Sequence, residues 1–233
     1  MVGTRNPLNL GAAARAMSNF GVCHLRVVRP WEPSFREARS AMGAADLLAE
    51  AKQYRAVADA VADCALVVGT TSVGHRELCH PLKVLEQGAL LIRRRLRGGK
   101  VALLFGSEKV GLSNDDFSHC HWLMRIPTRH EHGSMNLGQA VAVCLYELVR
   151  EGQTNFPDTK RIVARAGQLE RVTALLFDIL NQSGYVKPRS SDITEQKLRR
   201  LVRRMQLDPD DARTWLGLIR QIAWKLGQHG IDE

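Results

Sequence analysis

The sequence predicts an α/β domain with a mainly parallel sheet, followed by a small all-helical module. Short, continuous apolar runs alternate with helical patterns through the first two thirds of the 233 residues, an alternation typical of parallel sheets. A polar stretch at residues 152–158, which contains glycine and proline, is typical of a linker. No strand pattern follows it. We therefore expect two domains, residues 1–155 and residues 156–233.

Four runs have the composition of strands. The clearest are continuous rather than alternating, as expected for strands buried on both faces of a parallel sheet. The runs are His24–Val28, Cys64–Val68, Val101–Phe105 and a weaker one, Trp122–Ile126. Gly69 and Gly106 follow the second and third runs directly. Because ligands commonly bind at the carboxyl ends of parallel strands, these two positions are candidates for a binding edge.

Helical patterns lie between and after the strands. Residues Asn9–Phe20 place small and apolar side chains on one face, with Asn9 as a candidate N-cap. Asn136–Arg150 is a second amphipathic stretch. The predicted C-terminal module has three helical segments, in the last of which Pro209 fits the first turn. These segments are Ile162–Leu180, Glu195–Met205 and Asp208–Leu226.

The chain is basic, with 33 Lys+Arg against 24 Asp+Glu and a formal net charge of +9. This charge favours an acidic partner such as RNA or DNA, although composition alone fits a merely basic surface equally well. A cationic cluster in the predicted module indicates phosphate contact, and an aromatic content of 6% argues against base stacking as the main device. The cluster is Lys197, Arg199, Arg200, Arg203 and Arg204.

Cysteine usage and hydropathy predict a cytoplasmic protein. The five cysteines are scattered and form no C-x-x-C pair, which favours free thiols in a reducing compartment. No run reaches the roughly 18–20 apolar residues that a membrane span needs, and the first residues have no apolar signal core. Close groups such as His119-Cys120-His121 lack the paired ligand spacing of zinc sites. We expect neither a metal nor a membrane partner.

Three stretches combine glycine or small residues with polar side chains. They are Asn9–Arg15, Phe105–Ser113 and Ser134–Asn136. Singly, each has an ordinary explanation: an alanine-rich core helix, a strand–helix turn and a helix cap. The second stretch has neither the Gly-Lys-Ser/Thr of a Walker A loop nor a G-x-G-x-x-G pattern, which disfavours nucleoside triphosphates and NAD.

In this order, the three stretches resemble the motifs of the SpoU/TrmH family of SPOUT RNA methyltransferases. The first family motif, N-x-G-x-x-x-R, is matched by Asn9, Gly11 and Arg15. The second, F-G-x-E-x-x-G-L, is matched by Phe105, Gly106, Glu108, Gly111 and Leu112. The third, S-L-N, is matched by Ser134, Met135 and Asn136, with Met for Leu. The helical tail is similar to that of the TrmJ-like branch, so the resemblance covers nearly the whole chain.

The resemblance implies a SPOUT-type parallel sheet flanked by helices, with a deep trefoil knot in the C-terminal half of the catalytic domain (residues 1–155). It also implies a helical RNA-binding module (residues 156–233) and a homodimer. The implied activity is 2′-O-methylation of tRNA with S-adenosylmethionine, in the anticodon loop at cytidine or uridine 32. The alternatives are an rRNA 2′-O-methyltransferase of the same family and a non-catalytic RNA-binding protein on this fold.

The resemblance also assigns roles to residues. Arg15 is implied to be catalytic and to contact RNA; because a guanidinium is a poor base, we expect it to bind the adjacent phosphate and stabilise the developing alkoxide. Asn9 and Asn136 would orient Arg15 or the ribose, and Glu108 would anchor the second loop. The expected cofactor-binding residues are Gly69, Thr70, Thr71, Gly106, Ile126, Gly133, Ser134 and Met135. The other expected RNA contacts are Lys197, Arg199, Arg200, Arg203 and Arg204.

The chain departs from the family pattern at two places. The family has a full apolar strand before the first motif, where this chain has only Met1–Thr4. We expect either a very short first strand or a chain that begins downstream of the natural start. The second departure is Gly133, where TrmJ-like proteins often carry Ser.

Overall fold

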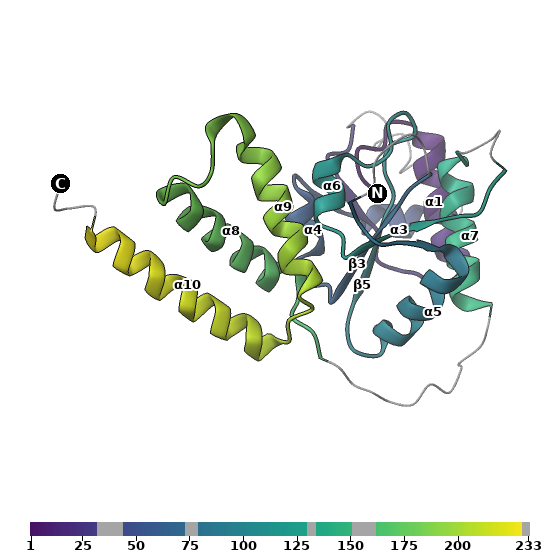
Figure 1. The fold of residues 1–233 in the computed structure, drawn as a ribbon. Coiled ribbons are helices and arrows are strands. Elements are labelled where there is room, and N and C mark those ends of the chain that lie inside the picture. Colours follow the sequence, from purple (N-terminus) through teal and green to yellow (C-terminus); the bar gives the residue numbers. More distant parts are fainter. Residues whose placement is uncertain (32–43, 73–78, 130–133, 151–161, 230–233) are drawn as a thin grey trace.

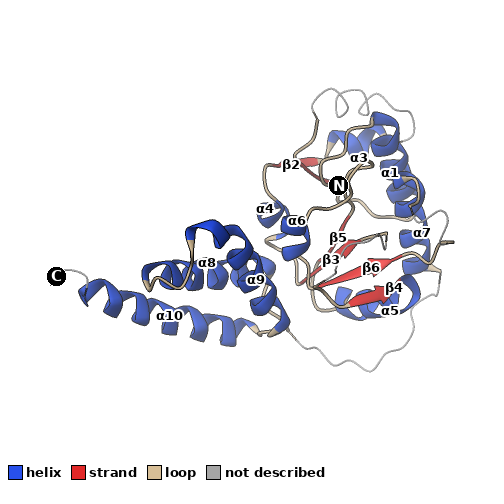
Figure 2. Cartoon of the chain, turned by 45° about the horizontal axis from the view of Figure 1, so that its top comes forward, coloured by secondary structure: helices blue, strands red, loops and turns tan. Residues whose placement is uncertain are grey.

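Figures 1 and 2 show the computed structural model, which describes residues 1–31, 44–72, 79–129, 134–150 and 162–229. An α/β part with parallel strands is followed by helices that lie beside it. The predicted linker at 152–158 and the predicted boundary at 155 lie outside the described residues. No described helix is long and apolar enough to cross a membrane.

The central sheet has four parallel strands in the order β4 (Leu82–Val84), β6 (Trp122–Arg125), β3 (Leu66–Thr70) and β5 (Val101–Leu104). β1 (Arg26–Val28) and β2 (Lys52–Tyr54) form a separate parallel pair. The predicted parallel sheet is confirmed, and all four expected runs contain strands. Sequence patterns missed β2 and β4 because neither strand has a buried residue.

Helices cover both faces of the sheet (Figure 2). Alternate residues of β3 enter two different cores: Leu66 and Val68 pack in one, and Val67 packs in the other. Burial on both faces explains why the strand sequences are continuously apolar. The helices of this part are α1 (Pro7–Asn19), α3 (Ala45–Ala49), α4 (Val57–Val61), α5 (Leu85–Leu96), α6 (Asn114–Ser118) and α7 (Leu137–Val149).

Helix α1 begins earlier than expected. Its N-cap is Asn6, whose side chain accepts a hydrogen bond from the Leu8 N–H at 2.9 Å. The assignment of Asn9 as N-cap is therefore wrong. Pro7 decides the boundary, because its fixed φ suits the first helical position and its missing N–H costs nothing there. The shift places Asn9 inside the helix, where its side chain is buried. The third motif behaves as expected: Asn136 caps α7 by accepting from the Gln139 N–H.

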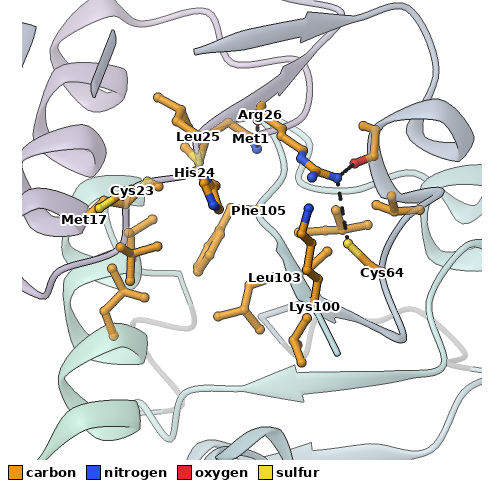
Figure 3. A pocket seen from close by; sticks show the side chains of 18 of the residues that line it. Met1, Met17, Cys23, His24, Leu25, Arg26, Cys64, Lys100, Leu103 and Phe105 are labelled. Atoms are coloured by element: carbon orange, nitrogen blue, oxygen red, sulfur yellow. Dashed lines mark hydrogen bonds between the residues drawn. The ribbon is translucent and has the colours of Figure 1, made fainter. Parts of the chain in front are cut away.

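Residues 1–3 lie between the two sheets. The Val2 N–H donates to the Phe105 carbonyl at 2.8 Å, and Val2 forms a parallel bridge with Val28. Beside these residues, between β1 and β5, is a mostly apolar cavity of about 500 Å³ (Figure 3). Leu25, Leu103 and Leu145 are among its lining residues. Residues 1–3 thus make an isolated parallel bridge to β1 rather than a strand of several residues.

The C-terminal part that the structure describes consists of α8 (Ala166–Gln182), a 3-10 turn η2 (Pro188–Ser190), α9 (Ser191–Arg204) and α10 (Pro209–His229). These helices share an apolar core of their own, which includes Leu169, Val202 and Ile219. They also attach to the sheet domain at the start of α8, where the Ala166 and Gly167 N–H groups donate to the carbonyls of Cys64 and Ala62.

Candidate active site

The three motifs meet at one place through a chain of hydrogen bonds. The Asn136 side-chain amide donates to the Asn9 side-chain oxygen at 2.8 Å, and the Asn9 amide donates to Glu108 at 3.1 Å. Glu108 also accepts from the backbone N–H groups of Arg5 and Asn6, each at 3.3 Å. Side chains about 100 and 127 residues apart are thereby held together. The network fixes the start of α1 against the loop after β5.

Arg15 projects from the same helix. Its side chain is exposed, and it lies a little under two turns after Asn9 on α1. The neighbouring residues Ala13 and Ala14 are buried, because α1 packs closely against α7. At Gly138 of α7, a Cβ atom would lie 2.6 Å from that of Ala12, so glycine is needed for this contact. The packing holds the α1 backbone rigidly and leaves the guanidinium free to meet a ligand.

The candidate cofactor loops follow three adjacent parallel strands. Gly69 and Thr70 end β3, Gly106 follows β5, and Ile126 follows β6. The Thr70 hydroxyl donates to the Leu104 carbonyl at 2.8 Å, and the Thr71 N–H donates to the Met124 carbonyl at 2.9 Å. Because parallel strands end at the same edge of a sheet, the structure brings these loops together.

Gly106 is required by the shape of the second loop. A Cβ atom there would lie 2.1 Å from the Gly111 carbonyl carbon and 2.2 Å from the Leu112 nitrogen. The chain after β5 therefore folds back onto itself, and Gly111 turns it with a φ of +70°. A loop this tight presents backbone rather than side chains. Ser134 and Met135 precede α7, with Ser134 exposed, whereas Gly133 lies outside the described residues.

Several buried or partly buried histidines and cysteines elsewhere in the sheet domain are uncharged near neutral pH. Burial lowers the pKa of His121 to about 3 and that of His119 to about 4. Burial raises the pKa of the Cys64 thiol to about 11 and that of Cys144 to about 12. These groups are poor acids and nucleophiles near neutral pH. Among the residues that the structure describes, no group of three or more His, Cys, Asp or Glu could hold a metal ion.

The cationic cluster on α9 is divided between two faces of the helix. Lys197 and Arg204 are exposed and Arg200 is partly exposed, so they can meet RNA. Arg199 and Arg203 are only 6% and 2% exposed and face the sheet domain. The expectation that Arg199 and Arg203 contact RNA is therefore wrong. The prediction failed because a run of Lys and Arg shows positive charge in the sequence but does not show which side of the helix is buried.

Two functional features escaped the sequence analysis. Glu170 on α8, which pairs with both buried arginines, was not singled out. A carboxylate next to Leu169, on the apolar side of an amphipathic helix, was the available signal. Asn6 was also overlooked, although Asn directly before Pro is a common helix start.

Comparisons with known proteins agree with this geometry. The model of the SpoU rRNA Methylase family matches residues 1–146. A protein of Sodalis glossinidius described as tRNA (cytidine/uridine-2′-O-)-methyltransferase TrmJ is 33% identical over 95% of this chain and 89% of its own. The crystal structure of TrmJ from Z. mobilis has a TM-score of 0.84 at 33% identity, covering 95% of this chain and 96% of that one. A probable methylase family protein from Haemophilus influenzae has a TM-score of 0.57 at 27% identity, over 98% of this chain and 96% of its own.

The chain belongs to the SpoU family of SPOUT methyltransferases. Within that family it is a TrmJ-like protein, because its sequence and structural similarity to TrmJ extends through the helical tail. The resemblance read from the three motifs is thereby confirmed.

Proposed function

We propose that this protein transfers a methyl group from S-adenosylmethionine to a ribose 2′-oxygen of tRNA, at cytidine or uridine 32 of the anticodon loop. The observation that carries the proposal is the Asn9–Glu108–Asn136 chain of hydrogen bonds, which joins all three motifs beside the strand ends. The names of the TrmJ relatives, which are cytidine/uridine 2′-O-methyltransferases of tRNA, support the substrate class.

The loops at the sheet edge fit the cofactor. Gly106 and Gly69 pack so closely against neighbouring atoms that a Cβ atom would collide with them, so main-chain groups line these loops. Backbone N–H and C=O groups suit the adenine and ribose edges, and Ile126 offers an apolar wall. S-adenosylmethionine supplies a methyl group already activated by a positive sulfur. The proposed contacts are Gly69, Thr70, Thr71, Gly106, Ile126, Gly133, Ser134 and Met135.

Arg15 acts on the RNA side of the reaction. As the methyl–sulfur bond breaks and the methyl–oxygen bond forms, the 2′-hydroxyl loses its proton to solvent and negative charge develops on the oxygen. The Arg15 guanidinium stabilises that charge and binds the adjacent phosphate in a bidentate contact, with two of its N–H groups. Asn9 is held from both sides by Glu108 and Asn136, so α1 presents Arg15 in one orientation. Lys197, Arg200 and Arg204 bind phosphates further along the tRNA.

The active form is a homodimer. Helices α1 and α7 leave apolar side chains uncovered in the single chain: Leu8 is 79% exposed and Tyr146 is 54% exposed. Val149 lies on the same α7 segment and is 47% exposed. A second copy would bury this surface, which includes part of the Arg15 helix.

The similarity to TrmJ also supports a deep trefoil knot in the catalytic domain. The five cysteines form no disulfide, which suits a reducing cytoplasm.

Methyl incorporation tests the proposal. The full chain is incubated with methyl-labelled S-adenosylmethionine and either tRNA or rRNA, with a chelator present. We expect label in tRNA alone, and none with the Arg15→Ala variant. The control is Arg55→Ala, which changes an exposed arginine far from the motifs in sequence and should be fully active. Label in rRNA alone would favour the rRNA enzyme of the same family. RNA binding without transfer to either substrate would indicate a non-catalytic protein.

A further inference from the structure

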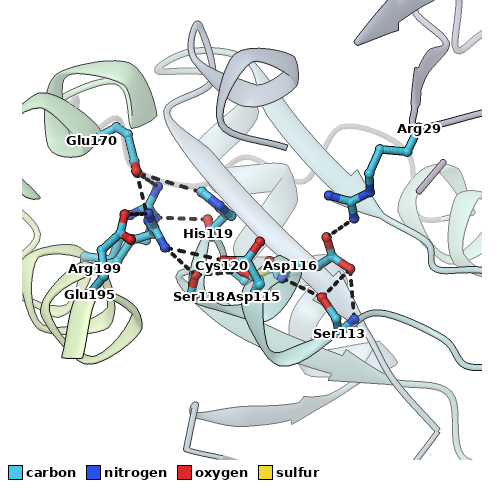
Figure 4. A network of polar contacts seen from close by, with 11 residues as sticks. Arg29, Ser113, Asp115, Asp116, Ser118, His119, Cys120, Glu170, Glu195 and Arg199 are labelled. Atoms are coloured by element: carbon cyan, nitrogen blue, oxygen red, sulfur yellow. Dashed lines mark hydrogen bonds and ion pairs between the residues drawn. The ribbon is translucent and has the colours of Figure 1, made fainter. Parts of the chain in front are cut away.

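The buried arginines of α9 form a cluster with acidic partners (Figure 4). Glu170 of α8 accepts from Arg199 Nε at 2.9 Å with one oxygen and from an Arg203 terminal nitrogen at 3.1 Å with the other. Glu195, one turn before Arg199, pairs with its other terminal nitrogen. Asp115 of α6 lies 3.7 Å from the remaining terminal nitrogen of Arg199, so the two buried guanidinium groups are matched by less buried carboxylates. The two arginines hold the pKa of Glu170 below its ordinary value, against the effect of burial.

The same arginines reach across to the sheet domain. Arg199 donates to the Ser118 hydroxyl at 3.0 Å, and Arg203 Nε donates to the His119 carbonyl at 2.9 Å. Both bonds are buried. Ser118 ends α6, the helix that follows the second candidate cofactor loop, and His119 is its C-cap. The guanidinium groups therefore connect the RNA-facing helix with the part of the molecule that carries the site.

Polar geometry, rather than apolar packing, orients α9. The helical part has its own apolar core, and among the described residues only Ala166 of α8 joins a core of the sheet domain. At the other described attachment, the backbone N–H groups of Ala166 and Gly167 at the start of α8 donate to the carbonyls of Cys64 and Ala62. These bonds fix the start of α8. The direction of α9 is fixed instead where the planar guanidinium groups of Arg199 and Arg203 bond both to α8 and to the sheet domain. Buried ion pairs add little net stability but can select one arrangement.

We propose that Arg199 and Arg203 are positioning residues for tRNA binding. They fix α9 on the sheet domain so that Lys197 and Arg204, on its exposed face, meet RNA phosphates at a set distance from Arg15. This inference rests on the proposed function. Rigid presentation matters because binding at two places on one RNA is strengthened only when the protein holds both places in matching geometry.

The test separates positioning from direct RNA contact and from folding. The first variant, Glu170→Met/Arg199→Met/Arg203→Met, removes the cluster but keeps similar volume, which buried ion-pair sites often tolerate. The control, Lys197→Met/Arg204→Met, removes only exposed cations. Domain geometry is measured without RNA, as the distance distribution between spin labels introduced by Lys52→Cys and Gln221→Cys, with exposed Cys23 and Cys79 changed to Ser. The remaining thiols are buried.

With the labelled chain diluted in excess unlabelled chain, so that a homodimer carries one labelled subunit, the parent and the control should give narrow distance distributions and the cluster variant a broad one. The cluster variant should bind tRNA at least about fivefold more weakly with an unchanged salt dependence. Its transfer rate at saturating tRNA should stay within about twofold of the parent rate. The control should lose affinity with a log–log salt slope shallower by roughly 1.4 to 1.8, since each lost phosphate contact removes about 0.7 to 0.9.

A narrow distribution in the cluster variant, an unchanged tRNA affinity, or a salt slope as shallow as that of the control would each overturn the proposal. If the cluster variant does not fold, Arg203→Lys replaces it. Lys keeps the positive charge but lacks the planar set of N–H donors with which Arg203 bonds to both domains. A broad distribution with weaker tRNA binding supports positioning, whereas parent-like values for both refute it. A parent that binds no tRNA contradicts the proposed function instead, and the spin-label distances still report on the docking.

Discussion

At the scale of single residues, Glu108 organises the site without being placed to react. It accepts hydrogen bonds from two backbone N–H groups and from Asn9, and it is the only described acceptor that links the second motif to the first. Glu108→Gln removes the charge that strengthens these bonds. We expect transfer to fall about tenfold, corresponding to one charge-assisted bond of roughly 1.5 kcal/mol. S-adenosylmethionine affinity should not change. Steady-state kinetics and calorimetry check this, with exposed Glu50→Gln as the unaffected control.

Gly106 gives a sharper test of the second loop. Gly106→Ala places a Cβ atom on the backbone of residues 111 and 112, so the loop must move. We expect S-adenosylmethionine binding to be lost. The circular dichroism spectrum should still show the helix content of the folded parent. Gly217→Ala in α10 is the matched control, because nothing lies within 4 Å of its added atom. That change should preserve binding and raise stability by up to about 1 kcal/mol. Parent-like cofactor affinity in Gly106→Ala would contradict the assigned loop.

His119 makes the stability of the molecule depend on pH. Its pKa is lowered to about 4, first by burial and then by Arg199 and Arg203. The unfolded side chain, with a pKa near 6.5, binds a proton that the folded one excludes. Its contribution is therefore complete above about pH 6.5 and is lost as pH falls toward 4, at up to about 1.4 kcal/mol per pH unit. Burial lowers the pKa of His80 to about 4 and that of His121 to about 3, so both add to the slope. Denaturant unfolding between pH 7 and 4.5 should show the combined slope, and His119→Gln should reduce it. Equal slopes in both proteins would show that His119 does not titrate as described.

At the scale of elements, β1 and β5 have backbone groups that face the cavity between them. Phe105 accepts from Val2 on that side, so Leu103 and Val101, two and four residues earlier, direct their backbone groups the same way. Four apolar, β-branched residues added before Met1 should extend the bridge at Val2 into a strand within this cavity. We expect the melting temperature to rise by several degrees, since about 1 kcal/mol corresponds to roughly 2–4 °C at this size. A Gly-Ser extension of equal length is the control, and equal melting temperatures would contradict the expectation.

The sequence predicted the elements that have strong patterns. The continuous runs that precede Gly69 and Gly106 contain most of β3 and the whole of β5, because burial on both faces leaves a clear apolar signal. The polar strand β2 left no such signal and was missed. The motif residues could be grouped only by resemblance, since hydrogen bonds such as Asn136 to Asn9 join positions 127 residues apart. The burial of Arg199 and Arg203 could not be predicted, because their carboxylate partner lies on another helix.

At the scale of the whole molecule, the helical tail is part of the architecture rather than a tethered appendage. Ala166 belongs to the apolar core beneath the sheet, and Arg199 and Arg203 are buried against α6. Removing the chain after residue 161 would expose these surfaces. We therefore expect the truncated protein to unfold at lower denaturant concentration than the full chain, measured by circular dichroism. Unfolding at the parent midpoint would show that the tail is energetically independent.

The central claim is that Arg15, held by the joined motifs, directs methylation of one tRNA ribose. The most direct measurement maps 2′-O-methyl groups nucleotide by nucleotide on unmodified tRNA treated with S-adenosylmethionine and either the parent or Arg15→Ala. The parent should give one methylated ribose, at nucleotide 32 with cytidine or uridine as the base. Arg15→Ala should give a rate lower by about 100-fold or more, as expected when a major electrostatic contact is lost. Methylation elsewhere, or an Arg15→Ala rate within threefold of the parent, would contradict the account.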